Sequence, residues 1–225
     1  MPNNENTLTK TITEGIADAL SLVGIPTGAM SEIYKAYQQE KIEKARDILL
    51  DEVKEGDFSS IGADERLSII HRFMLSSING NAKINLRLLA KLINSLLNGG
   101  KLEKGLYSSQ FSRYAQILET LSYEEIQTLA LLYKLKKDSE KEKIGGFQTF
   151  AKQEMRDPSP YYVKARETYS DINEFNALIY GLQRTGFIIP NQKQHVGIYQ
   201  LSPVFDKIIN LVDFQDALNK EKAGN

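Results

Sequence analysis

The chain has 225 residues, of which 41% are hydrophobic and 25% charged, a composition that supports a buried core and excludes a disordered tail. Its 28 Lys and Arg residues against 29 Asp and Glu residues give a net charge of −1, so no overall positive field attracts nucleic acid or an anionic membrane. The absence of cysteine excludes disulfides and thiolate chemistry, and two histidines, His71 and His195, leave little material for imidazole chemistry.

The N-terminal region predicts a helix rather than a targeting or membrane segment. Apolar residues spaced by three and four predict a helix over Leu8–Val23, and the first 15 residues carry Glu5 and Glu14 where a secretory signal needs a basic and then an apolar stretch. The uncharged run Ala19–Ser31 is shorter than the about 20 apolar residues that span a bilayer. We expect a cytoplasmic protein.

A long charged helix is predicted over Ser31–Glu55. Its apolar positions form a narrow stripe: Ile33, Tyr37, Ile42, Ala45, Ile48, Leu49 and Val53. Such a stripe packs against another helix, and two partners are open. It docks on Leu88–Leu97 of its own chain, or it forms the seam of a homodimer to which the Ser31–Glu55 helix contributes.

Three more helices are predicted before residue 120. One begins at Asp64 and is closed by Asn79-Gly80-Asn81, a deeply buried one spans Lys83–Leu97, and a shorter one spans Phe111–Leu118. We place a domain boundary near residues 119 to 122. The prediction is a helical region over 1–120 and a winged-helix-like region over 121–225.

The C-terminal region has the element order of a winged helix. Ser122 and Glu125 form a capping box, the clearest helix start in the sequence, and Asp171 caps a helix that ends before Gly186. Phe187–Ile189 and Val196–Leu201 predict two strands of a hairpin, and Ser202-Pro203 starts a helix over Val204–Val212. The segment Phe147–Met155 would supply the second helix. The fold class is therefore mostly α, with one short β-hairpin.

The helix capped by Asp171 is the third of this winged-helix order. It should bury one face and offer the other to a partner. The spacing predicts burial of Ile172, Phe175, Ile179 and Leu182. The candidate contacts to nucleic acid or to a protein partner are Asn173, Asn176, Tyr180, Gln183, Arg184 and, in the wing, Lys193 with His195. Because residues 158–225 hold equal numbers of basic and acidic residues, protein contacts are favoured over DNA.

A candidate basic face lies on the Lys83–Leu97 helix, where Lys83, Arg87 and Lys91 recur every four residues. It would bind phosphates or an acidic protein surface, or it would be partly paired with the acidic helix 31–57 of the same chain. The last alternative is favoured, and we expect no phosphate-specific site from these three residues.

The other candidate patterns favour structural roles. The acidic series Glu40, Glu43, Asp47, Asp51 and Glu55 is interleaved with Lys and Arg and is typical of an exposed helix face. His71 is expected to be a packed or surface histidine, Gly145-Gly146 lacks the lysine of a phosphate loop, and Tyr161-Tyr162 is expected to fill a gap between helices. No catalytic, cofactor-binding or metal-binding residues are predicted, and no cofactor is expected.

Four short motifs resemble those of a known family. They are Leu88–Leu92 (LLAKL), Ile117–Ser122 (ILETLS), Arg184–Ile189 (RTGFII) and Tyr199–Pro203 (YQLSP). Over about Leu88–Val212 the chain thereby resembles the abortive-infection alpha (Abi-alpha) family of bacterial phage-defence proteins. The resemblance implies a role in phage defence and carries over no catalytic residue.

The sequence therefore predicts a non-enzymatic protein that acts in bacterial or mobile-element conflict through protein contacts. The alternative is a winged-helix DNA-binding transcriptional regulator, and a third hypothesis is a membrane-active toxin built on Leu8–Ala29.

Overall fold

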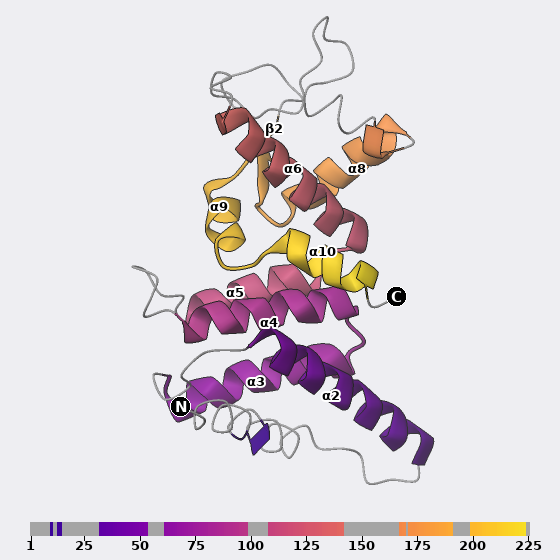
Figure 1. Ribbon diagram of the computed structural model, residues 1–225, viewed down its shortest axis with the longest axis vertical. Coiled ribbons are helices and arrows are strands. Elements are labelled where there is room, and N and C mark those ends of the chain that lie inside the picture. Colours follow the sequence, from indigo (N-terminus) through magenta and orange to yellow (C-terminus); the bar gives the residue numbers. More distant parts are fainter. Residues whose placement is uncertain are drawn as a thin grey trace, which may run out of the picture. The chain divides into compact units, whose positions relative to one another are not determined.

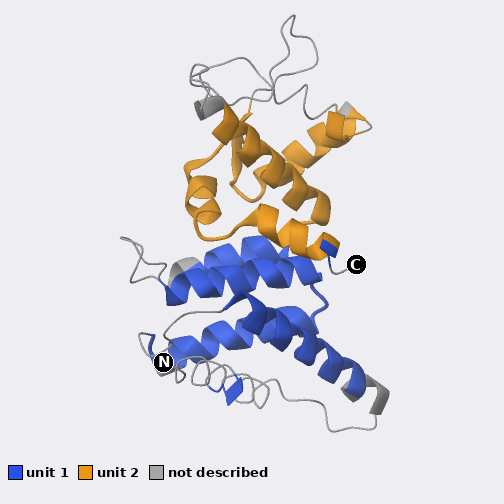
Figure 2. Cartoon of the chain, viewed as in Figure 1, with its two compact units in different colours: residues 1–120, 223–225 blue, residues 121–222 orange. Residues whose placement is uncertain are grey.

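The computed structural model describes residue 10 and residues 13–14, 32–53, 61–98, 108–141, 167–169, 171–190 and 199–223. The described chain is mostly helical with one short antiparallel hairpin, which confirms the predicted fold class (Figure 1). It divides into two compact units, residues 1–120 with 223–225 and residues 121–222 (Figure 2). No helix in these described ranges is long and apolar enough to cross a membrane.

Unit 1 is built around its third described helix. Its helices are α2 (Glu32–Glu52), α3 (Ala63–Ile78), α4 (Lys83–Leu97) and α5 (Ser108–Glu119). The α4 helix contacts the other three (Figure 1). Apolar residues lie around most of its circumference, and a helix of that kind is stable only when it is enclosed. The predicted deep burial of Lys83–Leu97 is confirmed, with Leu88, Leu92 and Ile93 fully inaccessible to solvent.

The stripe along α2 is covered by its own chain. Ile42, Ala45, Ile48, Leu49 and Val53 are each at most 6% exposed, because α2 packs on α3 and α4. The side chains of the predicted seam therefore lie in the core of unit 1, and the homodimer to which this helix contributes stays a prediction. Docking on the chain's own Leu88–Leu97 region is the alternative that the structure bears out.

The bounds of α2 and the role of one aromatic residue also differ from the prediction. The helix runs from Glu32 to Glu52, three residues short of the predicted end at Glu55. Tyr37, predicted in the apolar stripe, is 51% exposed, and the Nζ atom of Lys41 lies 4.6 Å from the centroid of its ring. Tyr37 therefore belongs to the solvent face of α2.

Polar contacts fix the other helix pairs of unit 1. Glu119 of α5 accepts two hydrogen bonds from the Arg72 guanidinium of α3, at 3.2 and 2.8 Å, and one from Ser76 at 2.6 Å. The buried Asn85 amide of α4 donates to the carbonyl of Leu118 at 2.7 Å. These bonds satisfy polar groups that burial would otherwise leave without partners.

Unit 2 keeps the order of a winged helix. Its elements are α6 (Tyr123–Lys141), α8 (Ile172–Gln183), β1 (Ile188–Pro190), β2 (Tyr199–Leu201), α9 (Pro203–Ile209) and α10 (Phe214–Ala223). The strands pair antiparallel, with Ile188 opposite Leu201 and Pro190 opposite Tyr199. The segment Phe147–Met155, predicted as the second helix, lies outside the described residues, as does most of the predicted Leu8–Val23 helix.

The predicted helix caps of unit 2 are confirmed. The Ser122 amide donates to Glu125 Oε2 at 2.9 Å and the Glu125 amide donates to Ser122 Oγ at 3.2 Å, which is the reciprocal capping box. Asp171 accepts from the Asn173 amide, and Ser202 accepts from the Phe205 amide. These side chains satisfy amides that have no partner inside the helix, and so they set where α6, α8 and α9 begin.

The core of unit 2 is aromatic. Phe175, Ile179 and Leu182 of α8 are at most 2% exposed, as predicted, whereas the side chain of Ile172 lies outside the description. The Phe205 ring of α9 packs edge-on against Phe187 with centroids 5.6 Å apart, and it packs in a tilted arrangement against Phe214 with centroids 5.9 Å apart. Aromatic pairs in these arrangements stabilise a core beyond the area that they bury.

Two boundaries in unit 2 differ from the prediction, and one helix was missed. The strand β1 begins at Ile188 rather than at Phe187, and α9 ends at Ile209 rather than at Val212. The helix α10 was not predicted. Its signals were present in the sequence, because Asp213 caps it by accepting from the Asp216 amide, and Phe214, Ala217 and Leu218 lie on one buried face.

Candidate functional site

Of the three residues of the predicted basic face of α4, two form ion pairs with described residues of the same chain and one does not. Arg87 Nη1 lies 2.9 Å from both Asp51 Oδ2 and Glu52 Oε1, and Lys91 Nζ lies 2.8 Å from Glu52 Oε2. Arg87 and Lys91 are therefore paired with the acidic helix of the same chain, which was the favoured interpretation. Lys83, one helical turn earlier, is exposed and lies outside this cluster.

The side chains of the Arg87–Glu52–Lys91 cluster are mostly buried. The Glu52 side chain is 3% exposed, and those of Arg87 and Lys91 are 12% and 14% exposed. Burial lowers the pKa of Arg87, but hydrogen bonds to Asp51 and Glu52 outweigh this effect and leave that pKa above its usual value. The cluster links α2 to α4, and its two cations are not available to a phosphate group.

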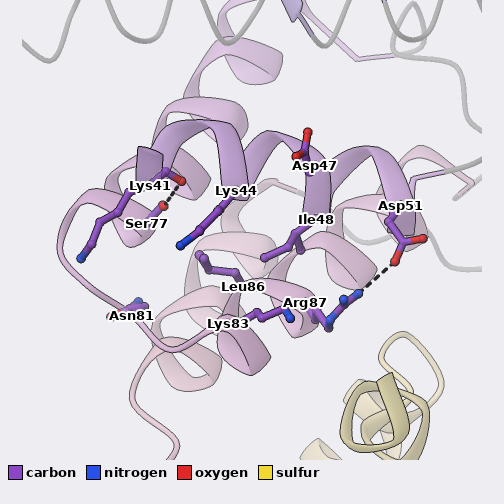
Figure 3. Close-up of a pocket in the computed structure, with 10 residues that line it drawn as sticks. All are labelled: Lys41, Lys44, Asp47, Ile48, Asp51, Ser77, Asn81, Lys83, Leu86 and Arg87. Carbon is purple, nitrogen blue, oxygen red and sulfur yellow. Dashed lines mark hydrogen bonds and ion pairs between the residues drawn. The ribbon is translucent and has the colours of Figure 1, made fainter. Parts of the chain in front are cut away.

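A cavity of about 580 Å³ opens beside this cluster in unit 1 (Figure 3). Its lining residues are Lys41, Lys44, Asp47, Ile48, Asp51, Ser77, Asn81, Lys83, Leu86 and Arg87. Figure 3 shows Lys44 extending from α2 toward α4, whereas Asp47 points away from α4. Four cations, two carboxylates and the side chains of Ile48 and Leu86 thus surround a space of the size that small ligands occupy.

A second candidate region is the outward side of α8 with the adjacent strand, which we call the α8 face. It consists of Asn173, Asn176, Ala177, Tyr180 and Gln183 of α8, with Tyr199 of β2. Tyr180 is 58% exposed, and its ring meets that of Tyr199 edge-on with centroids 5.7 Å apart. Burial and the hydrogen bond with Tyr180 raise the pKa of Tyr199, and a hydrogen bond with Gln183 partly opposes this shift.

The one arginine predicted to contact a partner from this region is already paired. Arg184, which ends α8, makes a two-pronged contact with Glu125, in which Nη1 contacts Oε1 and Nη2 lies 2.8 Å from Oε2. This hydrogen bonding raises the pKa of Arg184. Burial raises the pKa of Glu125, but the bonds from Arg184 and from the Ser122 amide outweigh it, so the pKa lies below its usual value. Arg184 therefore holds α8 against the start of α6.

The remaining candidate residues lie within or on the surface of helices, or they lie outside the described residues. His71 is half-buried in α3, and Glu40 pairs with Lys44 at 2.6 Å on the exposed side of α2. The candidates outside the described residues are Lys193, His195, Glu55, Gly145, Gly146, Tyr161 and Tyr162. Within the described part of the chain, no group of three His, Asp or Glu residues is placed to hold a metal ion.

Sequence reasoning missed how Tyr180 and Tyr199 meet, and how the cavity forms. Tyr180 was found by its helix position, but its contact with Tyr199 depends on the register of the hairpin. Lys41 and Lys44 were seen only as charges on an acidic helix, because a cavity with Lys83 appears once α2 crosses α4. Comparison of the chain with protein-family models, curated proteins and solved structures finds no match.

Proposed function

We propose that this protein is a non-enzymatic binding protein that contacts another protein through the α8 face. The observation that carries the proposal is the exposed Tyr180 ring, which is fixed against Tyr199 on a helix that bears no free cation. Tyrosine is enriched at the centres of protein interfaces, because a ring with few rotatable bonds buries a large area at a low cost in entropy.

The charge of α8 favours a protein partner over DNA. The helix has no Lys or Arg between Ile172 and Gln183 and one acid, Glu174. A recognition helix needs cations nearby for phosphate contacts, which supply most of the affinity for DNA. Arg184 is committed to Glu125, so the amides of Asn173 and Asn176 would approach base edges without that support.

The setting that we propose is bacterial conflict with phages or other mobile elements, in the cytoplasm. It is supported by the resemblance of the motifs in Leu88–Val212 to the abortive-infection alpha family. The α8 face and the setting are separate parts of the proposal, because the face rests on geometry and the setting on sequence motifs.

Affinity capture with quantitative mass spectrometry tests the proposed face. The tagged full chain, the Tyr180→Ala variant and the Tyr37→Ala variant are compared in the same cells. Tyr37 is the matched control, because it is the other large exposed aromatic residue among the described side chains and lies in unit 1. We expect a protein that the wild type and Tyr37→Ala retain and that Tyr180→Ala loses. Equal recovery with all three contradicts the proposed face.

The DNA-binding alternative has its own test, because α8, the hairpin and α9 follow the winged-helix order. Fluorescence anisotropy measures binding of random duplex DNA at physiological salt. We expect binding no tighter than about 1 µM, within the range of non-specific association. Tighter binding that Asn173→Ala and Asn176→Ala together abolish supports the regulator instead.

A further inference from the structure

We propose that the cavity between α2 and α4 binds a small organic anion, that is, an apolar body carrying a phosphate, sulfate or carboxylate group. This site lies in unit 1 and does not depend on the function proposed for the α8 face of unit 2. The proposal stands on three features of the cavity: lysines that lack buried carboxylate partners, an apolar lining and its size.

The lysines of the cavity lack strong carboxylate partners. The Lys83 side chain makes no ion pair or hydrogen bond with the described residues, and Lys41 contacts the Tyr37 ring rather than an acid. Lys44 pairs only with Glu40, and both of these side chains are more than 60% exposed. An ion pair in that position contributes little free energy, so an incoming anion can replace it.

The two carboxylates that line the cavity do not cancel this charge. Asp51 is bonded to Arg87, and Asp47 lies 3.3 Å from Arg46 and points away from α4 (Figure 3). The α4 helix also begins at Lys83 with no side-chain cap and no acid in its first turn. The positive end of its dipole therefore adds to the field of the lysines rather than being neutralised.

The apolar lining favours an organic anion over a bare ion. Ile48 and Leu86 are 6% and 5% exposed, so only their edges reach the cavity between Lys44 on α2 and Lys83 on α4. The methylene stems of the lysines add to this lining. A volume of about 580 Å³ lies within the usual range for small-molecule sites and exceeds what an inorganic phosphate fills. A ligand with a ring system and one or two anionic groups satisfies both the apolar lining and the lysines.

The test uses 8-anilinonaphthalene-1-sulfonate as the anionic probe and N-phenyl-1-naphthylamine as its uncharged counterpart. Each probe is titrated against the full chain, and its fluorescence gives a Kd. The pocket variant is Lys44→Gln with Lys83→Gln. The control variant is Arg113→Gln with Lys134→Gln, two exposed cations outside the cavity whose loss changes the net charge equally. Circular dichroism verifies that both variants are folded.

We expect saturable binding of the sulfonate probe by the wild type and the control, and a Kd about tenfold weaker in the pocket variant, which is the order of one lost charge-assisted contact. The uncharged probe should bind all three proteins alike and more weakly than the sulfonate. An equal Kd for the sulfonate in the pocket and control variants, or no saturable binding by the wild type, overturns the proposal. Equal affinity of the wild type for the two probes also overturns it.

Discussion

Gly80 ends α3 in a backbone conformation that other residues rarely adopt. Its φ angle is +87°, and a Cβ atom there would lie 3.2 Å from the Nζ atom of Lys41. We expect Gly80→Ala to lower the free energy of unfolding by about 1 to 2 kcal/mol, because the left-handed region is costly for an L-residue. Gly80→Asn should cost less, since asparagine tolerates this region. Urea denaturation of both variants measures the difference, and equal stability of wild type and Gly80→Ala contradicts the argument.

The stability of unit 2 should depend on pH through the ionisation of Glu125. Its pKa in the folded chain lies below the usual 4.5, so its charged form stabilises the fold above that pH. The contribution is lost as the pH falls below 4.5 and through the pKa of the folded state. We therefore expect Glu125→Gln to be less stable than the wild type at pH 7, and the difference to shrink toward pH 3. The measurement is the urea midpoint at each pH.

The control for this prediction is Glu124→Gln. Glu124 precedes Glu125 in the first turn of α6 but is exposed. This variant should follow the wild type across the pH range. A loss of the same size and pH dependence in both variants would show that the acidic first turn, and not the Arg184 contact, is responsible.

Some side-chain contacts can be predicted from the sequence and others cannot. The Ser122–Glu125 capping box was predicted because its partners are three residues apart. The Arg184–Glu125 contact was not, because its partners are 59 residues apart and meet only when α8 packs on α6. Local hydrogen bonds follow from spacing, whereas contacts of this second kind depend on the tertiary fold.

At the scale of the element, the Arg87–Glu52–Lys91 cluster links α2 to α4 through one buried acid, and an exposed acid lies next to it. Glu52 and Asp51 both contact Arg87, but their side chains are 3% and 48% exposed. We expect Glu52→Gln to lower the free energy of unfolding by about 1.5 to 3 kcal/mol, because two mostly buried cations lose their shared carboxylate. Asp51→Asn should lower it by about 1 kcal/mol or less, because the Asp51 side chain is exposed. Chemical denaturation compares them, and a larger loss for Asp51→Asn contradicts this account.

The apolar stripe of α2 belongs to the core of unit 1. Leu49 is fully buried within its own chain, whereas the adjacent Leu50 is half-exposed. We expect Leu49→Ala to lower the free energy of unfolding by about 2 to 5 kcal/mol through the cavity it leaves, and Leu50→Ala to cost clearly less. Light scattering accompanies the denaturation curves. A Leu49→Ala variant of unchanged stability that converts a dimer into a 25 kDa species would restore the dimer seam.

Periodicity predicted which faces are buried better than where elements end. The α8 core residues and the α4 core follow directly from spacing by three and four. The stripe of α2 was equally visible, but a stripe fits a partner within the chain as well as one in a second copy. Only the covering of α2 by α3 and α4 decides between these, and no local pattern carries that information.

At the scale of the whole molecule, two candidate sites occupy different units. The cavity lies in unit 1, and the α8 face lies in unit 2. Composition was informative about the sites only as an average, because a net charge of −1 hides both the lysines around the cavity and the lack of cations on α8. The residue types were visible in the sequence, whereas their gathering into a site depends on how the helices cross.

The most direct measurement of the proposed function is site-specific photo-cross-linking. The photoreactive residue p-benzoyl-phenylalanine replaces Ala177 of the α8 face in one variant and Tyr37 in the other, since both positions are exposed and Tyr180 stays in place. Irradiation in cells joins the probe to whatever protein lies against it. We predict one defined heavier band for position 177 that is absent for position 37. No cross-link at position 177, or the same products at both positions, would contradict a protein interface on the α8 face.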